Sequence, residues 1–369
     1  MRLALVHDQL LTRAGSERVF LSIVKAFPDA DIYTLCYNPN STLEEYQDTR
    51  VRTLWLDPFV RSHRTFKLVF PVATHAMERL DLRSYDMVLS SSATVAKYVR
   101  RHGGRHVSYC YYPTRAIWES ANYFSQEGGL AQAAFMRMLP RLRQRDYLAA
   151  QAVSRFVAIS ETTRSAIRKY YDRGADVLFC PTDTERFIPR ERVEKGGHFL
   201  LVSRLERWKQ VDYAITAFNH LGLPLRIVGT GPDEGRLRRL AGRNVEFLGT
   251  VDDTRLALEY QCARAVIFTP ELEYGLVPLE ANAAGTPVIA LGRGGVLETM
   301  APASGRDSDP SGRGTAVLFQ DPTPEALVDA VNRFEGIAWD RAHLIRHASA
   351  FSVAAFQGKL KEVVEKWAR

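Results

Sequence analysis

The chain has 369 residues, of which 46% are hydrophobic and 25% charged. This is the composition of an ordinary globular protein, and the length predicts two or more domains. The net charge of +7 is compatible with anionic partners, but no RNP-like, zinc-finger or basic-helix pattern is visible, so we predict no nucleic-acid partner. No stretch reaches the roughly 18 consecutive apolar residues of a membrane-spanning helix, and any membrane contact is expected to be peripheral.

The start of the chain and its cysteines favour a cytoplasmic protein. The apolar run in "MRLALVHD" is too short for a signal peptide and predicts a first strand. The four cysteines have no C-x-x-C spacing, so we expect them to be reduced and buried. They are Cys36, Cys110, Cys180 and Cys262.

Short apolar runs alternate with helical stretches along most of the chain, which indicates an α/β protein with parallel sheets covered by helices on both faces. Strands are expected at 3–6, 31–35, 87–91, 106–110, 156–160, 176–180, 199–203, 225–229, 245–249, 265–269, 287–290 and 316–319. The polar segment 184–197 is predicted to be a linker. It would separate two doubly wound domains, 1–183 and 198–369, facing each other across a cleft, and the last helix could fold back across the hinge.

The segment "TPELEYGLVPLEANAAGTPVIA", which starts at Thr269, predicts a strand, a loop, a helix that ends at Gly285, and a further strand. In such units the loop after the first strand binds ligands, because the helix N-terminus offers unpaired N–H groups. Gly275 lets a ligand approach the backbone, and Glu280 leans back toward the loop. A phosphate on the N–H groups and a hydroxyl-bearing ring beside Glu280 would fit a nucleotide sugar. From this stretch alone, a plain solvated loop fits equally well.

Two other predicted strand ends carry polar residues suited to phosphate and sugar. Arg204 and Lys209 follow one strand and could clamp a diphosphate, although surface Arg and Lys are common. Gly229 and Gly231 form a tight turn before a helix, without the Gly-Lys-Ser/Thr ending of a P-loop. All three loops are predicted at the same edge of one sheet. Three loops suited to phosphate and sugar are less probable there by chance than one such loop.

These motifs together resemble retaining glycosyltransferases of the GT-B fold, family 4, which include glycogen synthases and lipopolysaccharide mannosyltransferases. The resemblance rests on "VSRLERWK", "IVGTGP", "GLVPLEANAAGTPVIA", "GRGGVLET" and "CPTDTERF". The stretches "LVHDQLLTRAGSERV" and "YCYYPTRAIWE" are similar to a bacterial subgroup that transfers mannose from GDP-mannose to lipid-linked glycans. The similarity covers essentially the whole chain.

The resemblance implies roles for matching positions. Arg204 and Lys209 would bind the donor diphosphate, and Glu280 the nucleotide ribose. The other donor-side positions are Gly15, Gly229, Gly231, Tyr274, Gly275 and Leu276. Residues proposed to contact the acceptor are His7, Asp8, Tyr111, Arg115 and Trp118. For the His-Asp pair and for the aromatic residues, a purely structural role fits about as well.

Two positions depart from the family's pattern. The first of its paired glutamates falls on Leu272, between Glu271 and Glu273, and the subgroup's histidine is replaced by Tyr111. If the loop kept the family's backbone, Leu272 would face the donor sugar. We therefore predict a shifted loop in which Glu273 takes the catalytic carboxylate's place. A deoxy sugar with less need of that carboxylate is the alternative.

The sequence thus favours a cytoplasmic, membrane-peripheral mannosyltransferase that uses GDP-mannose and a polyprenyl-diphosphate-linked or other glycan acceptor. No Asp-x-Asp pair or metal-ligand cluster is visible, so no metal and no cofactor beyond the nucleotide-sugar co-substrate are expected. The alternatives are a UDP- or dTDP-sugar donor, and a catalytically silent nucleotide-sugar-binding subunit. The segment "FMRMLPRLRQRDYL" could meet an anionic membrane or be a helix with a solvated basic face.

Overall fold

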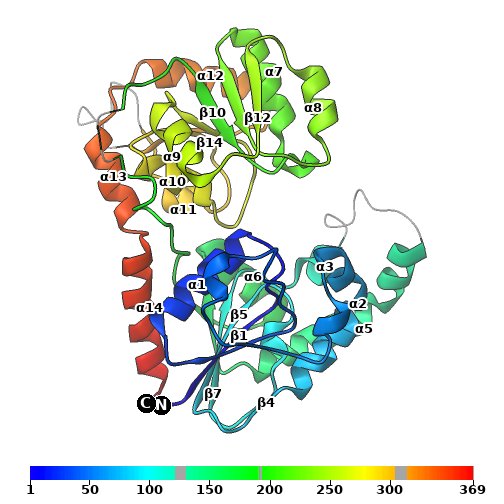
Figure 1. Cartoon of the computed structure of the whole chain (residues 1–369). Helices are drawn as coiled ribbons and strands as arrows, with labels where there is room; N and C mark the ends of the chain where they lie inside the picture. The colour runs from blue at the N-terminus through cyan, green and yellow to red at the C-terminus, as the bar shows by residue number, and fades with distance from the viewer. Residues whose placement is uncertain (121–129, 190, 192, 304–313, 369) are drawn as a thin grey trace. The chain divides into compact units, whose positions relative to one another are not determined.

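The computed structural model describes residues 1–120, 130–189, 191, 193–303 and 314–368, and the chain divides into two compact units (Figure 1). The first comprises Met1–Phe179 with Phe356–Arg369, and the second comprises Cys180–Ala355. The segment predicted as a linker, 184–197, is thus counted with the second unit. The end of the chain is counted with the first.

The first unit is built on a parallel seven-stranded sheet in the order β3-β2-β1-β5-β7-β8-β9. Its strands are β1 (Leu3–His7), β2 (Asp31–Thr34), β3 (Val51–Thr53), β5 (Met87–Ser92), β7 (Arg105–Cys110), β8 (Arg155–Ala158) and β9 (Ala175–Val177). A separate small pair joins β4 (Asp81–Leu82) to β6 (Arg101–His102). The helices are α1 (Gly15–Ala26), η1 (Glu44–Tyr46), η2 (Asp57–Phe59), α2 (His63–Arg79), η3 (Ala96–Tyr98), α3 (Arg115–Trp118), α5 (Leu130–Ala152) and α6 (Glu161–Tyr171).

The second unit contains a parallel six-stranded sheet in the order β12-β11-β10-β13-β14-β15. Its strands are β10 (Phe199–Val202), β11 (Leu225–Val228), β12 (Val245–Gly249), β13 (Val266–Phe268), β14 (Val288–Leu291) and β15 (Ala316–Phe319). Its helices are η4 (Arg207–Lys209), α7 (Val211–Leu221), α8 (Glu234–Leu240), α9 (Asp253–Cys262), α10 (Leu276–Ala283), α11 (Val296–Thr299), α12 (Pro324–Glu335) and α13 (Arg341–Ser349).

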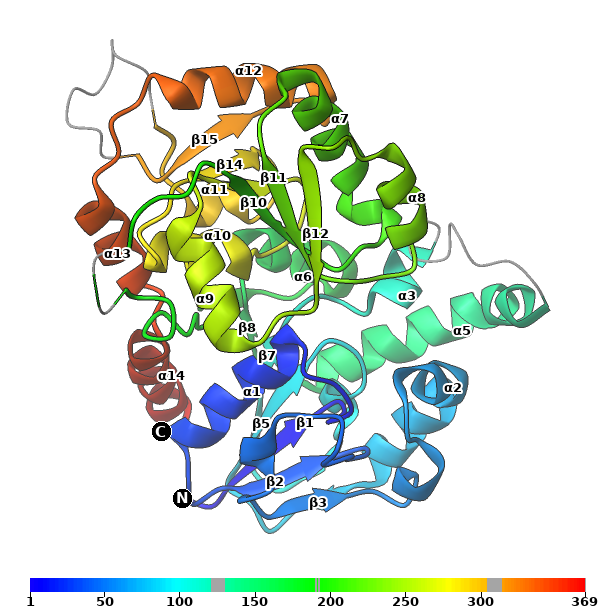
Figure 2. The same cartoon turned by 45° about the horizontal axis from the view of Figure 1, so that its top comes forward.

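Alternation along the strands explains why helices cover both faces of the second sheet. The helices α7 and α12 lie on one side of this sheet, and α9 and α10 on the other (Figure 2). Leu201 and Ile267 join the apolar cluster with α7 and α12, whereas their neighbours Leu200 and Val266 join the cluster with α9 and α10. Successive side chains of a strand point to opposite faces. Continuous apolar runs are therefore what a sheet buried on both faces requires.

The last helix, α14 (Val353–Ala368), starts in the second unit and continues in the first. Gln357 donates a hydrogen bond to the carbonyl of Ser22 on α1 at 2.9 Å, and the Phe356 ring packs edge-on against Tyr109. The polypeptide therefore returns to the first unit at its end. Among the described residues, no helix combines the length and hydropathy needed to cross a membrane.

Candidate active site

Each large sheet reverses its strand order at one point. In the second unit this point lies between β10 and β13, because the chain continues to β11 and β12 on one side and to β14 and β15 on the other. In doubly wound sheets, ligands bind at the carboxyl ends of the two strands that flank such a reversal. The loops concerned are 203–210 after β10 and 269–275 after β13.

Thr269 joins these two loops. Its hydroxyl donates to the carbonyl of Lys209 at 2.7 Å, and its own carbonyl accepts the hydroxyl of buried Tyr213 at 2.7 Å. The first residue after β13 therefore fixes the end of η4. This places the half-buried Lys209 beside the loop that leads into α10.

Arg204 and Lys209 belong to one cluster of side chains after β10. The exposed Arg204 guanidinium contacts one oxygen of Glu206 at 2.6 Å, and the Trp208 indole N–H donates to the other oxygen at 2.6 Å. The Lys209 ammonium lies 4.1 Å from the centroid of the Trp208 ring. Glu206 and Trp208 thus hold the two cations on the same loop, where both can meet an anion.

Gly229 and Gly231 have a packing role that the sequence did not predict. A Cβ on Gly229 would lie 1.9 Å from the carbonyl oxygen of Ser203, and one on Gly231 would lie 2.3 Å from that of Leu205. Gly229 also has φ +127°, which disfavours other residues. The two glycines let the loop after β11 press against the loop that carries Arg204. The space that these glycines leave open is thus occupied by backbone of the neighbouring loop.

The N-terminus of α10 is suited to anion binding. Gly275 is its N-cap residue and contributes no side-chain hydrogen bond to the first turn, and Leu276 is the first helical residue. The unpaired N–H groups of a first turn attract anions. A Cβ on Gly275 would lie only 3.0 Å from the Phe268 ring, which explains the glycine at this position. One turn later, the half-buried Glu280 accepts a hydrogen bond from Tyr260 at 2.7 Å.

The loop before α10 is held by a second glycine-rich loop. Leu272 pairs with Gly294 in a parallel bridge, and the N–H of Gly295 donates to the Leu272 carbonyl at 2.7 Å. The Leu272 side chain packs against the apolar cluster of the second unit. Glu271 is exposed and Glu273 is half-buried. The leucine thus has a packing partner of its own, which is compatible with a loop arranged differently from the family's.

The Tyr274 side chain is also held by the protein. Its hydroxyl donates to the carbonyl of Cys180 at 2.9 Å, and burial raises the pKa of this phenol well above its usual value. Tyr274 therefore fixes the loop through its side chain. Its contribution to a donor would come from the backbone.

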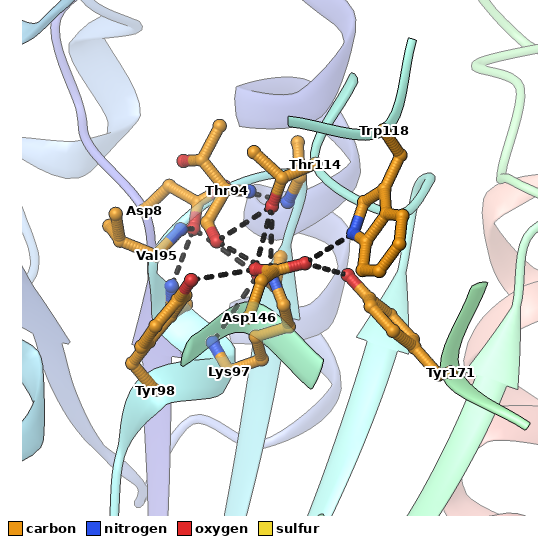
Figure 3. A network of polar contacts seen from close by, with 12 residues as sticks. Asp8, Thr94, Val95, Lys97, Tyr98, Thr114, Trp118, Asp146 and Tyr171 are labelled. Carbon is orange, nitrogen blue, oxygen red and sulfur yellow. Dashed lines mark hydrogen bonds and ion pairs between the residues drawn. The ribbon is translucent and has the colours of Figure 1, made fainter. Parts of the chain in front are cut away.

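In the first unit, Asp8 has a structural role instead of the predicted acceptor contact (Figure 3). Its carboxylate accepts the N–H groups of four consecutive residues after β5 at 2.6–2.8 Å. These residues are Ala93, Thr94, Val95 and Ala96. Both carboxylate oxygens are engaged, and only 5% of the residue is exposed. The prediction that Asp8 contacts the acceptor is corrected accordingly.

His7 is likewise buried. Its ring stacks on Phe20 with centroids 4.5 Å apart, and its Nδ1 lies 3.1 Å from the Ser91 side-chain and carbonyl oxygens. Burial lowers the pKa of the imidazole, with Asp8 and Glu17 acting in the opposite direction. This environment keeps a neutral ring inside the sheet and away from a ligand.

Tyr111 and Gly15 meet near the start of α1. The Tyr111 hydroxyl donates to the carbonyl of Ser16 at 3.0 Å and hydrogen-bonds to Ser91 at 2.8 Å. Gly15 opens α1, and the buried Glu17 in its first turn accepts hydroxyl hydrogen bonds, including that of Ser16 at 2.8 Å. A carboxylate of the protein itself therefore lies at this helix start.

Trp118 belongs to a buried polar network that sequence reasoning missed (Figure 3). Asp146 on α5 is fully buried, and its carboxylate contacts donors from several other segments. The contacts are Lys97 at 2.8 Å, Tyr98 at 2.7 Å, Thr114 at 3.2 Å, Trp118 at 2.7 Å and Tyr171 at 2.7 Å. Trp118 thus anchors α3 through its indole N–H, and its partly buried ring stays a predicted acceptor contact.

Arg115, at the start of α3, lies with its guanidinium 4.8 Å from the centroid of the Tyr112 ring. It remains a candidate for contact with an anionic acceptor. Within the described ranges, no group of three or more His, Cys, Asp or Glu side chains could hold a metal ion.

Comparison with known proteins finds a family similarity that lies in the second unit. Residues 183–350 match the model of Glycosyl transferases group 1. The chain is 33% identical to a GDP-mannose-dependent monoacylated α-(1-6)-phosphatidylinositol monomannoside mannosyltransferase of Corynebacterium glutamicum, over 49% of this chain and 48% of that protein. It is 22% identical to an α-1,3/1,6-mannosyltransferase of Candida glabrata, over 85% of this chain and 81% of that protein.

Other curated relatives match over limited parts of their length. An exopolysaccharide phosphotransferase of Streptomyces coelicolor is 33% identical over 39% of this chain, which spans only 16% of that protein. Together with the 48% of the Corynebacterium protein, the chain spans about half or less of these two relatives. Their activities therefore do not transfer directly to this chain.

Solved structures agree with the fold over the whole chain. Sucrose-phosphate synthase from Thermosynechococcus elongatus superposes with a TM-score of 0.75 at 17% identity, covering 99% of both chains. Anabaena HepE in complex with UDP-glucose gives 0.71 at 17% identity, covering 99% of this chain and 100% of that one. The predicted GT-B fold is confirmed, and the match to the group 1 glycosyltransferase model lies within the second unit.

Proposed function

We propose that the chain is a retaining glycosyltransferase that moves mannose from GDP-mannose to a lipid-linked glycan of a bacterial surface polysaccharide. The observation that carries the proposal is the arrangement at the switch point between β10 and β13. There, Arg204 and Lys209 on one loop face the same strand edge as the α10 N-terminus, which has no side-chain cap. Mannose as the transferred sugar is supported by the mannosyltransferases among the relatives.

In this proposal the second unit binds the donor through its diphosphate. The N–H groups at the start of α10 and the two cations of the β10 loop would hold the phosphates. Glu280 would bind the ribose hydroxyls. As the bond to the sugar breaks, negative charge grows on the leaving diphosphate, and Arg204 and Lys209 would stabilise it. These cations are the reason to propose a reaction without a metal.

Retention of configuration would need no protein nucleophile. The acceptor hydroxyl would attack from the face that the diphosphate leaves, and its proton would pass to that leaving group. Catalysis would then depend on position and on charge stabilisation. Glu273, half-buried next to Tyr274, is proposed to contact the sugar in place of the missing carboxylate at Leu272.

Binding of nucleotides tests the donor. Titration calorimetry with GDP, UDP and dTDP should show the tightest binding for GDP. The mannosyl or glucosyl derivatives of these nucleotides should then be titrated in the same way. The rival is a UDP-sugar donor, which is favoured by the similarity to Anabaena HepE in complex with UDP-glucose. Clear binding of UDP without binding of GDP would remove the mannose assignment.

A second rival is a catalytically silent subunit that binds nucleotide sugar. Leu272 and Tyr111 favour it, because both stand where the family has groups that serve the sugar, and both have packing or hydrogen-bond partners inside their own unit. Transfer of labelled mannose to extracted lipid-linked glycans distinguishes the two. Tight donor binding without transfer or donor hydrolysis would favour the silent subunit.

Peripheral contact with an anionic membrane, on the cytoplasmic side, is also proposed. On α5, Arg137 and Arg141 are exposed together with Met136 and Met138, which are 42% and 41% exposed. Cations interleaved with exposed apolar side chains suit an anionic lipid surface. Flotation with phosphatidylglycerol vesicles should recover the wild type and lose an Arg137→Gln, Arg141→Gln variant. Equal binding to phosphatidylcholine vesicles would contradict an electrostatic contact.

A further inference from the structure

The hydroxyl of Tyr260 contacts the carboxylate of Glu280. Tyr260 lies on α9 and is fully buried, and its O–H donates to Oε2 of Glu280 on α10 at 2.7 Å. A hydrogen bond to a carboxylate is shorter and stronger than one between neutral groups. The carboxylate proposed to meet the ribose is therefore held from behind by a residue that no ligand can reach.

Tyr260 is itself fixed from two directions. Its ring packs edge-to-face on Phe187, with centroids 5.2 Å apart. Its carbonyl accepts the hydroxyl of Thr286 at 2.6 Å, just after the end of α10. Phe187 comes from the "CPTDTERF" motif. The packing thus leads from this motif through Tyr260 to Glu280.

The phenol is kept as a hydrogen-bond donor. Burial raises the pKa of Tyr260 well above its usual value, and the neighbouring negative charge of Glu280 raises it further. The O–H therefore stays protonated at every pH at which the protein would be assayed and remains a donor toward Glu280.

We propose that Tyr260 is a positioning residue that orients Glu280 toward the ribose hydroxyls of the bound nucleotide. This inference rests on the proposed function, in which Glu280 binds the ribose. Removing the phenolic hydroxyl would take away one of the contacts that orient the carboxylate and would weaken only the part of the affinity that depends on the 2′- and 3′-hydroxyls. It would leave the diphosphate contacts unchanged.

Calorimetry with a nucleotide and its 2′,3′-dideoxy analogue separates these parts of the affinity. The probe is GDP with dideoxy-GDP, or UDP with dideoxy-UDP if the wild type binds UDP. In Tyr260→Phe, we expect the dissociation constant for the ribonucleotide to rise by about 5- to 20-fold, because the ribose contact of Glu280 would be weakened and not lost. The constant for the dideoxy analogue should stay within about 2-fold of the wild type.

The matched control is Tyr171→Phe. Tyr171 is also fully buried and also donates to a carboxylate, that of Asp146 at 2.7 Å, but in the first unit. This variant should keep the wild-type preference for ribonucleotide over dideoxynucleotide. Phe187→Leu removes the ring that packs on Tyr260. It should also reduce the preference for ribonucleotide over dideoxynucleotide, and it is an independent test of the positioning role.

The outcomes separate the inference from the function beneath it. If Glu280→Gln loses the preference for ribose while Tyr260→Phe and Phe187→Leu keep it, the positioning role is overturned and the donor site stands. If the wild type binds no nucleotide, or binds both analogues equally, the proposed role of Glu280 is overturned and Tyr260's role with it. Loss of the preference in Tyr260→Phe, with normal dideoxy binding, supports the inference.

Discussion

The two large sheets reverse their strand order in the same way, yet the two reversal points differ in charge. In the first unit, between β1 and β5, four backbone N–H groups after β5 already bind an anion, the Asp8 carboxylate. In the second unit, between β10 and β13, the α10 N-terminus has no side-chain cap, and Arg204 and Lys209 lie on the neighbouring loop.

This difference shows how the same sheet arrangement can serve as a structural support in the first unit and as a candidate binding site in the second. N–H groups at a strand end favour an anion in both units. Where the chain supplies the anion itself, the loops are cross-linked and the site is closed to a ligand. Where it supplies cations, an external anion such as a nucleotide diphosphate can complete the arrangement.

Removing the internal anion should have the largest effect. Asp8→Ala leaves four N–H groups without their acceptor, so we expect the free energy of unfolding to fall by about 3 to 5 kcal/mol, among the largest single-residue effects. Urea unfolding followed by fluorescence measures it, and faster hydrogen exchange at 93–96 would locate it.

The same variant offers a sharper test. If the N–H groups of 93–96 form a latent anion site, sulfate should restore part of the lost stability relative to chloride at equal ionic strength. The wild type in the same salts corrects for the general stabilisation by sulfate. Equal responses of variant and wild type would mean that the loop collapses when Asp8 is removed.

Removing a cation in the second unit should leave stability nearly unchanged and affect ligand chemistry. Lys209→Ala should lower turnover by roughly ten- to a hundred-fold, the equivalent of about 1.5 to 3 kcal/mol, because leaving-group charge grows in the transition state. Arg207→Ala, which removes an exposed cation from the same short helix, is the control. A folded Lys209→Ala protein with normal turnover would exclude the diphosphate clamp.

Much of the fold could be predicted, because buried parallel strands leave continuous apolar runs. The strands expected at 245–249 and 316–319 occur at these bounds, and the others lie within one to three residues of the prediction. Among the described residues, β3 and the two short strands β4 and β6 were missed. Val51–Thr53 is short and largely exposed, and only its pairing with β2 makes it a strand.

The position of the candidate site could be predicted from the sequence, but the contact partners of its side chains largely could not. Strand ends and glycines located the loops with Arg204 and Lys209, because the carboxyl edge of a sheet follows from topology alone. The backbone partners of Asp8 lie up to 88 positions away in the sequence. No local pattern predicts such a contact. Lys97 and Asp146 look like solvated charges in the sequence, and only the packing of α5 against η3 buries them together.

The carboxylates before and in α10 should have smaller effects than Lys209. Glu273→Gln and Glu280→Gln are expected to slow transfer or donor hydrolysis by on the order of ten-fold, the loss of one charged hydrogen bond. Glu271→Gln, an exposed neighbour, should behave like the wild type. Normal activity of Glu273→Gln together with failure of Glu280→Gln would mean that Leu272 marks a changed donor sugar or a weaker catalyst.

The smallest expected effect concerns a group that the first unit keeps neutral. His106 on β7 is fully buried, and burial lowers its pKa from 6.5 to about 3, with His102 adding to the shift. Because the folded pKa lies below that of the unfolded chain, protonation favours the unfolded state. The stabilisation is complete above pH 6.5 and is lost as the pH falls toward 3.

Between pH 6.5 and 5.5 this one group should lower the free energy of unfolding by about 1 kcal/mol. His106→Gln will be less stable at neutral pH, since it loses the contact to Ser90 at 2.8 Å, but its stability should fall less steeply over that interval. His220→Gln, at an exposed position on α7, should keep the wild-type slope. Urea midpoints at pH 7.5, 6.5 and 5.5 give these slopes. Parallel curves for wild type and His106→Gln would mean that acid acts on the first unit through groups other than His106.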